Sequence, residues 1–177
     1  MFNVNTTGNF ALIHGGGQER KHRAGTENVP GMVGMGVALE HAVSHMAENS
    51  AKMTKLRDKM IASIAANIPE VKLNGHPEKR LPNNVNFSIK YIEGESILLM
   101  LNLNGVAASS GSACTSGSLD PSHVLLAMGL PHETAHGSLR MTLSEFTTEQ
   151  EIDYTLELLP QIVKRLRAMS PLYKGEK

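Results

Sequence analysis

Cys114 lies in the segment SSGSACTSGS, residues 109–118, and is the only cysteine among the 177 residues. Small hydroxyl residues and glycines flank it, and no bulky side chain lies within four positions. Glycine and serine leave the backbone free to move. A few residues of slack would let the sulfur swing by on the order of 10 Å. This composition predicts a nucleophile or sulfur carrier that moves between two places; the alternative is a surface thiol in a linker.

Arg140 is the second residue with a chemical pattern around it. In SLRMTLS, residues 138–144, Leu139, Met141 and Leu143 alternate with polar residues. The alternation predicts a strand on which Arg140, Ser138 and Thr142 point away from the core. A guanidinium group can hold a carboxylate through two hydrogen bonds. The alternative is a solvated charge on an open sheet face.

A glycine-rich segment, HGGGQERKHRAGTEN at 14–28, contains three consecutive glycines, several basic residues and Thr26 just before an expected helix. Glycines allow a ligand to approach the backbone, and a hydroxyl with free N–H groups at a helix start suits a phosphate. The GxxxxGK[ST] spacing of a P-loop is absent. The segment therefore predicts a phosphate contact of another kind.

The eight histidines show no spacing typical of a metal site. His41 and His45 stand one helical turn apart without a third ligand, so we expect no bound metal. A thiol hydrolase is a further possibility, because His123, His132 and His136 follow the cysteine. No Asn or Asp is placed to orient any of these histidines, which argues against it.

A long helical stretch should connect the glycine-rich segment to the rest of the chain. Apolar residues spaced three or four apart predict helix from about Val29 to Ile68, ending at Pro69. A break around Asn49 and Ser50 predicts a kink or two consecutive helices. At ~1.5 Å per residue the stretch would reach roughly 60 Å. We therefore expect an arm that bridges two lobes.

Short strands and helices follow. We expect strands at 71–74, 84–90 and 106–110, together with a helix over 94–105. After the cysteine segment, Asp120 is expected to cap a short helix that has Pro121 in its first position and ends at Gly129. The last helix should open with a capping box from Thr147 to Gln150, and Pro160 should kink it.

Composition narrows the classes of partner. The chain has 17 basic and 17 acidic residues, and 41% of its residues are apolar. This balance predicts a globular protein that binds neither nucleic acid nor an anionic membrane. There is no apolar run long enough to span a bilayer and no secretory signal, and a single cysteine cannot form an internal disulfide. We expect a cytoplasmic protein.

Several segments, read in order, resemble one known family. HGGGQERKHRAGTENV, LPNNVNFS, SSGSACTSGSLDPSHVLLAMGL, AHGSLRMTLSEFTTEQEID and AMSPLY are similar to the C-terminal portion of NifS/IscS-type cysteine desulfurases. These are pyridoxal phosphate (PLP) enzymes of aminotransferase class V, fold type I. The resemblance covers about residues 12–173. It implies an α+β fold: a small C-terminal domain with a short sheet packed against helices, plus a long N-terminal helical arm.

The domain organisation implied by the resemblance has three parts. Residues 1–28 would be the end of the large domain with its glycine-rich loop, and 29–68 a connecting helix or helix pair. Residues 69–177 would form the small domain.

The resemblance also implies roles for single residues. Cys114 corresponds to the nucleophile that takes sulfur from L-cysteine and carries it as a persulfide, leaving L-alanine. Arg140 corresponds to the arginine that holds the substrate's α-carboxylate. Thr26 corresponds to a threonine that contacts the PLP phosphate of the other subunit. Implied partners are an iron–sulfur scaffold or another sulfur acceptor, and either a second copy in a homodimer or a partner carrying the missing large domain.

The chain departs from the family at the cofactor lysine. In the family this lysine lies shortly upstream of the triple glycine, but residues 1–11 contain none, and Lys21 follows the glycines. We therefore expect that this polypeptide alone neither binds PLP covalently nor desulfurates cysteine. The alternative to a desulfurase part is a non-catalytic adaptor that binds scaffolds, or a truncated pseudo-enzyme.

Overall fold

The computed structural model describes residues 11, 13–110 and 120–175. The chain divides into two compact units, Met1–Met46 and Ala47–Lys177, which are described separately below. Among the described residues, no helix is both long and apolar enough to cross a membrane.

The first unit contains helices α1 (Gln18–Lys21) and α2 (Val29–Ser44). Asn28 caps α2, because its side-chain oxygen accepts a hydrogen bond from the Gly31 N–H at 3.1 Å. Every side chain of α2 is exposed, although most of them are apolar. The helix starts where the apolar stripe predicted.

The helix break lies at His45, which separates α2 from α3 (Met46–Asn67). The expectation of two consecutive helices is therefore confirmed, but the break around Asn49 and Ser50 was wrong in its position. Both residues lie inside α3, where Asn and Ser are only mildly unfavourable. Asn49 also makes a tertiary contact there, because its side-chain nitrogen donates to Glu145 Oε2 at 2.6 Å.

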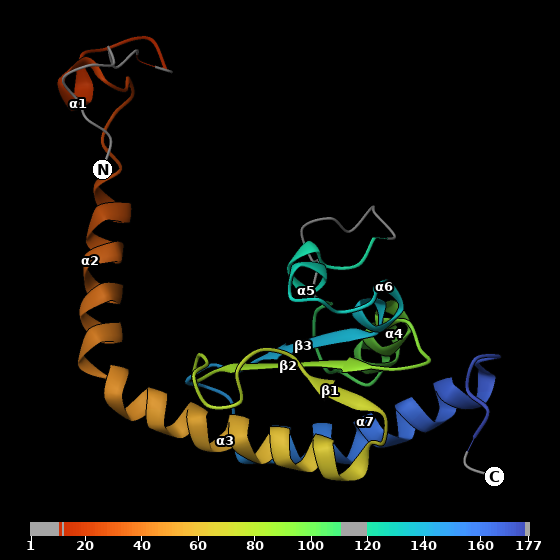
Figure 1. Cartoon of the computed structure of the whole chain (residues 1–177). Helices are drawn as coiled ribbons and strands as arrows, with labels where there is room; N and C mark the ends of the chain where they lie inside the picture. Colours follow the sequence, from red (N-terminus) through yellow and green to blue (C-terminus); the bar gives the residue numbers. More distant parts are fainter. Residues whose placement is uncertain (1–10, 12, 111–119, 176–177) are drawn as a thin grey trace. The chain divides into compact units, whose positions relative to one another are not determined.

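The second unit is built around a three-stranded antiparallel sheet (Figure 1). Its strands are β1 (Val71–Leu73), β2 (Asn84–Ile89) and β3 (Ser138–Thr142), and β2 lies in the middle. Phe87 lies opposite Leu73 on one side and Leu139 on the other. The alternation along β2 therefore produces one apolar face, and β2 lies within the strand expected at 84–90.

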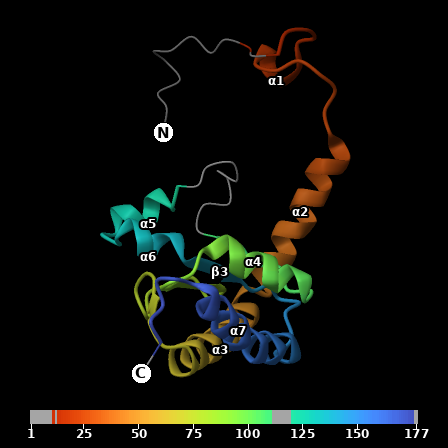
Figure 2. The ribbon, with the colours of Figure 1, turned by 90° about the vertical axis from the view of Figure 1, so that its right-hand side faces the viewer.

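Helices α3 and α7 (Glu149–Met169) lie side by side against the sheet (Figures 1 and 2). Helix α4 (Gly94–Leu103) packs against α7 and β3. The core between these elements contains the following buried side chains: Leu56, Met60, Ile64, Val85, Phe87, Ile89, Ile97, Leu101, Leu139, Met141, Ile152, Leu159, Ile162 and Val163. This single core fixes the sheet on which Arg140 stands.

Two short helices, α5 (His123–Ala127) and α6 (His132–His136), form a smaller cluster around Leu125, Leu130 and Ala135. Helix α5 starts after Ser122, so the expected start at Asp120 and Pro121 was wrong.

Two further expectations about boundaries need correction. Residues 106–110 do not form a strand, and only Ser109 makes a bridge to β3. The capping box of α7 is formed by Thr148 and Glu151, one residue later than expected. The hydroxyl of Thr147 instead accepts a hydrogen bond from Ser144 N–H at 2.9 Å. Helix α7 continues through Pro160.

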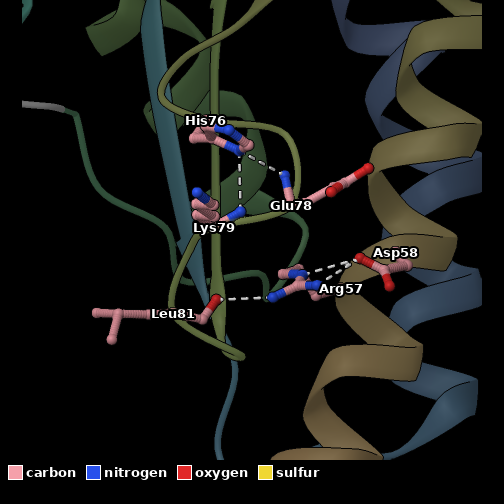
Figure 3. Close-up of polar contacts among 6 residues, drawn as sticks. All are labelled: Arg57, Asp58, His76, Glu78, Lys79 and Leu81. Carbon is pink, nitrogen blue, oxygen red and sulfur yellow. Dashed lines mark hydrogen bonds and ion pairs between the residues drawn. The ribbon is translucent and has the colours of Figure 1, made fainter.

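The loop between β1 and β2 is fastened to α3 by Arg57, which is buried (Figure 3). Its Nη1 donates to the Leu81 carbonyl at 3.0 Å, and its Nη2 pairs with Asp58 at 2.7 Å. Within the loop, His76 Nδ1 accepts hydrogen bonds from the backbone N–H groups of Glu78 and Lys79. These contacts hold the end of the hairpin in place without a tight turn.

Arg167 of α7 performs a similar task at the other end of the sheet. It is buried, and it donates to the carbonyl oxygens of Lys90 at 3.2 Å and Pro69 at 2.8 Å. Its guanidinium also lies over the Tyr173 ring, 5.2 Å from the centroid. Arg167 therefore ties the last helix to the ends of both α3 and β2.

Candidate functional site

Arg140 stands in the middle of β3, half-buried, between Asn86 of β2 and Ser109. Its backbone N–H donates to Ser109 O at 2.6 Å, and Ser109 N–H donates to Arg140 O at 2.9 Å. Both backbone groups of Arg140 therefore point toward Ser109. The pair with Asn86 is consequently of the non-hydrogen-bonded kind, in which opposing side chains come closest.

Ser109 also contacts the guanidinium group. Arg140 Nη2 donates to Ser109 Oγ at 3.4 Å, and the same hydroxyl donates to Ser110 O at 3.0 Å. Ser109 is the first residue of the cysteine segment recognised in the sequence. The start of that segment is thus bound directly to Arg140.

The face of the sheet opposite the core is polar. Asn74, Asn86, Arg140 and Ser109 follow one another across the sheet, and we call these four residues the polar row. Asn74 N–H donates to Asn86 O at 2.9 Å, which continues the β1–β2 register by one residue. Because directly opposed residues of antiparallel strands share a face, the four side chains lie on the same side.

Asn74 is the most firmly held member of the polar row. It is 5% exposed, and its Nδ2 donates to Asn86 Oδ1 at 2.8 Å and to Ser88 Oγ at 2.9 Å. Arg80 Nη2 donates to its carbonyl at 3.0 Å. Burial, and then the nearby Arg57 charge, lower the pKa of Arg80.

The expected orientation of β3 is correct in part. Thr142 is exposed and Arg140 is half-buried, whereas Leu139 and Met141 are buried. Ser138, expected to point to solvent with Arg140, is 3% exposed. Ser138 lies opposite Ser88, which is itself fully buried, so the polar face is covered at this end.

The polar row was missed in the sequence, apart from Arg140. In the sequence, Asn86 and Ser88 alternate with apolar residues, and this pattern predicts a strand but no site. Their spacing contained the signal, because polar residues at every second position of a strand share a face. Asn74 lies just past β1, at a position where periodicity gave no indication of burial.

Cys114 lies outside the described residues. Cys114 follows Ser109 by five positions, and an extended chain covers at most about 3.3–3.6 Å per residue. The Cα of Cys114 is therefore limited to within about 18 Å of the Cα of Ser109. Arg140, which contacts Ser109 directly, falls inside this radius.

Thr26 belongs to the first unit, where its side chain is exposed. It follows Gly25, whose φ of 106° favours glycine, and it precedes the Asn28 cap of α2. Nearby, Arg23 pairs with Glu27 at 2.6 Å and also donates to Gly25 O. An exposed hydroxyl at the start of a 16-residue helix fits a contact to a phosphate group. Thr26 thus fits a contact to the phosphate group of PLP.

Other clusters in the described residues do not adjoin the polar row. His132 and His136, with ring centroids 5.4 Å apart, line a hollow of about 710 Å³ that also includes Tyr91, Glu133 and Leu172. Over the residues that the structure describes, no three His, Cys, Asp or Glu side chains are arranged to hold a metal ion.

Residues 6–155 match the family described as Aminotransferase class-V. The chain belongs to this family. A cysteine desulfurase IscS from Clostridium botulinum strain Hall is 60% identical over 165 residues, which are 92% of this chain and 42% of the relative. The IscS of Methanosarcina thermophila is 56% identical, over 93% of this chain and 41% of its own length. The chain therefore spans about two fifths of the length of the curated relatives it matches.

Solved structures agree with these relatives. A NifS-like protein from Rickettsia africae ESF-5 is 31% identical and has a TM-score of 0.76, covering 88% of this chain and 40% of that chain. Another NifS-like protein is 36% identical with the same TM-score, over 88% of this chain and 39% of its own. The resemblance to NifS/IscS-type enzymes and the α+β fold class are confirmed.

Proposed function

We propose that this chain is the C-terminal part of a PLP-dependent cysteine desulfurase, in which Cys114 takes sulfur from L-cysteine and leaves L-alanine. The proposal is supported by the 60% identity to an IscS enzyme across most of this chain. The observation that carries it is the bridge between Ser109 and Arg140. This bridge links the residue expected to hold the substrate to the segment expected to attack it.

Arg140 is proposed to hold the α-carboxylate of L-cysteine. Its guanidinium is half-buried on the polar face, and Nη2 makes a contact of only 3.4 Å with Ser109. Over the described residues, the other N–H groups of the fork have no recorded acceptor and can serve a carboxylate. Partial burial strengthens such a charge-assisted bond relative to one in open water.

Cys114 is proposed to act as the thiolate nucleophile. Its sulfur attacks the sulfur of L-cysteine, and a bond forms between the two sulfur atoms. The C–S bond of the substrate breaks, its electron pair stays on carbon, and that carbon takes a proton to give L-alanine. The products are one persulfide on Cys114 and one alanine. A free thiol has a pKa of ~8.5, so the reaction near neutral pH requires loss of the thiol proton.

PLP is implied by the class-V aminotransferase family. Thr26 would donate its hydroxyl to the cofactor phosphate. When bound, PLP supplies an electron sink for the electron pair left on carbon. We infer that the lysine and the remaining ring contacts come from protein outside this chain, either a large-domain partner or a longer form of the same polypeptide.

The acceptor of the persulfide is proposed to be a protein thiol, such as that of an iron–sulfur scaffold. A thiolate of the acceptor would attack the outer sulfur, so that the persulfide moves and Cys114 is released as a thiolate. A homodimer and a cytoplasmic location stay predictions.

The test separates sulfur transport from cysteine breakdown. The purified chain is first treated with inorganic polysulfide, and its intact mass is measured. We expect one added sulfur atom on the wild-type chain, which an acceptor dithiol then removes, and none on Cys114→Ser. The chain mixed with L-cysteine and PLP is expected to release no alanine. Absence of a transferable sulfur on Cys114 would contradict the sulfur-carrier role, and scaffold binding by Cys114→Ser would then support the adaptor alternative.

A further inference from the structure

The polar row contains a second hydrogen-bond donor next to Arg140, and this donor has no assigned role. Asn86 lies directly opposite Arg140 in the β2–β3 register. As the backbone groups of Arg140 point toward Ser109, the Asn86–Arg140 pair belongs to the close, non-hydrogen-bonded kind. The two side chains therefore stand side by side on the polar face.

The contacts of Asn86 fix which end of its amide faces Arg140. Its Oδ1 accepts the hydrogen bond from Asn74 Nδ2 at 2.8 Å, so the oxygen is turned toward β1. The oxygen and nitrogen of an amide lie on opposite sides of Cγ, which turns Nδ2 toward β3. Among the described residues, Asn86 Nδ2 has no hydrogen-bond acceptor, and its side chain is half-buried.

Asn74 holds this orientation rigidly. It is 5% exposed and makes contacts with Asn86, Ser88 and Arg80. A donor whose rotamer is fixed by buried neighbours loses little entropy when a ligand binds. Within the part of the chain that the structure describes, Asn86 Nδ2 therefore has no acceptor, and the Arg140 fork beside it donates only to Ser109 Oγ.

We propose that Asn86 Nδ2 is the second donor of the carboxylate subsite, so that Asn86 and Arg140 together hold the α-carboxylate of L-cysteine. This inference rests on the proposed function. A carboxylate has two oxygens and accepts several hydrogen bonds, which matches donors arriving from two adjacent strands. Asn74 is a positioning residue, because it acts only through Asn86.

The test uses nuclear magnetic resonance (NMR) spectroscopy of the isotope-labelled chain under reducing conditions. The chain is titrated with L-cysteine and, separately, with cysteamine, which lacks the carboxylate. We expect L-cysteine to shift the Nε–H signal of Arg140 and the Nδ2 signals of Asn86, and cysteamine to leave both in place. These wild-type signals report the contact even where a variant fails to fold.

Variants give a second measurement. Asn86→Asp is nearly isosteric but replaces the donor with a negative charge, and should raise the apparent Kd for L-cysteine by about 10-fold or more. Asn84→Asp makes the same change two residues earlier on β2, on the same face of the sheet. We expect less than about a threefold effect for it. The spectrum of each variant shows directly whether it is folded.

The possible outcomes separate this inference from the proposed function. If the Arg140 signal shifts while Asn86 does not, and Asn86→Asp binds like wild type, Asn86 is not a ligand contact and the role of Arg140 stands. If neither signal responds to L-cysteine, the carboxylate assignment of Arg140 fails, and the Asn86 inference fails with it.

Discussion

At the scale of single residues, two glycines next to β3 lie where a side chain would collide with neighbouring backbone atoms. Gly137 precedes β3, and a Cβ on it would lie 2.1 Å from Ile89 O and 2.9 Å from Ile92 O. Its φ of −81° suits any residue, so the restriction is steric. Gly94 is similarly close to Ser138 O, at 2.7 Å. These backbones approach closely because α4 and the start of β3 share the covered end of the polar face.

Gly137→Ala should therefore destabilise the second unit by about 1–3 kcal/mol, because the backbone of β2 or of α6 must shift. The measurement is the free energy of unfolding from urea denaturation. Gly34→Ala serves as the control, since a Cβ there meets nothing within 4 Å. It should be neutral or mildly stabilising, because alanine favours helix. Equal stability of Gly137→Ala and wild type would show that the close approach does not occur in solution.

At the scale of elements, α3 and α7 are joined across their exposed sides by Lys59. Its Nζ lies 2.9 Å from Glu149 Oε1 and 2.5 Å from Asp153 Oδ1. Hydrogen bonds to Asp153 and then to Glu149 raise the pKa of Lys59. The hydrogen bond from Lys59 lowers the pKa of Glu149 from its ordinary value of 4.5. Lys59 is partly exposed and the two carboxylates are exposed, so solvent screening keeps their effect on stability small.

Lys59→Met should consequently lower the free energy of unfolding most between pH 4.5 and pH 10.5, which are the ordinary pKa values of Glu149 and Lys59. The contribution of Glu149 is present above pH 4.5 and is lost as the pH falls through its lowered folded pKa. The contribution of Lys59 is present below pH 10.5 and is lost as the pH rises through its raised folded pKa. Urea denaturation at a series of pH values checks this, with the exposed Lys72→Met as the control. A difference from wild type that stays constant into the acid range would contradict the assignment.

The sequence predicted helices and strands wherever buried apolar residues recur at a regular spacing. Val85, Phe87 and Ile89 alternate because one side of β2 packs on helices, and α7 follows the spacing of its apolar stripe. The ends of helices and strands depend on local hydrogen bonds, which the spacing of apolar residues does not encode. Thr147 and Thr148 each have a capping-box partner three residues later, Gln150 and Glu151, so the spacing does not decide between them.

In the candidate site, the outward direction of Arg140 could be predicted, because Arg140 takes a polar position in an apolar alternation. Asn86 could not be assigned, since its role follows from a cross-strand register that depends on long-range pairing. The contact between Ser109 and Arg140 was missed for the same reason. It joins residues 31 apart through a single bridge, which is too short to appear as a strand pattern.

At the scale of the whole molecule, α2 is an apolar helix with no covered face. Its exposed apolar side chains range from 48% to 70% exposure, and include Met35 and Leu39. Apolar surface of this extent in a globular protein marks an interface. The proposed homodimer would cover it with a second copy, consistent with the symmetry that most assemblies adopt.

The purified chain should therefore self-associate, and the double variant Met35→Lys with Leu39→Lys should shift it toward monomer. The two substitutions lie one turn apart on the same helix face. Sedimentation velocity over a concentration series measures the change. Glu40→Lys is the matched control, because it alters the net charge by the same amount on the same helix. A wild-type chain that stays monomeric at every concentration would contradict the prediction.

The contacts of Arg167 limit the order in which parts of the protein can fold during synthesis. The carbonyls that it binds at Lys90 and Pro69 precede it by 77 and 98 residues. Ile162 and Val163, which belong to the same core cluster as Phe87, are equally late in the chain. On a nascent polypeptide leaving the ribosome, the β1–β2 hairpin would keep part of its apolar face exposed until α7 emerges. During that interval its unfinished apolar side would be open to chaperones.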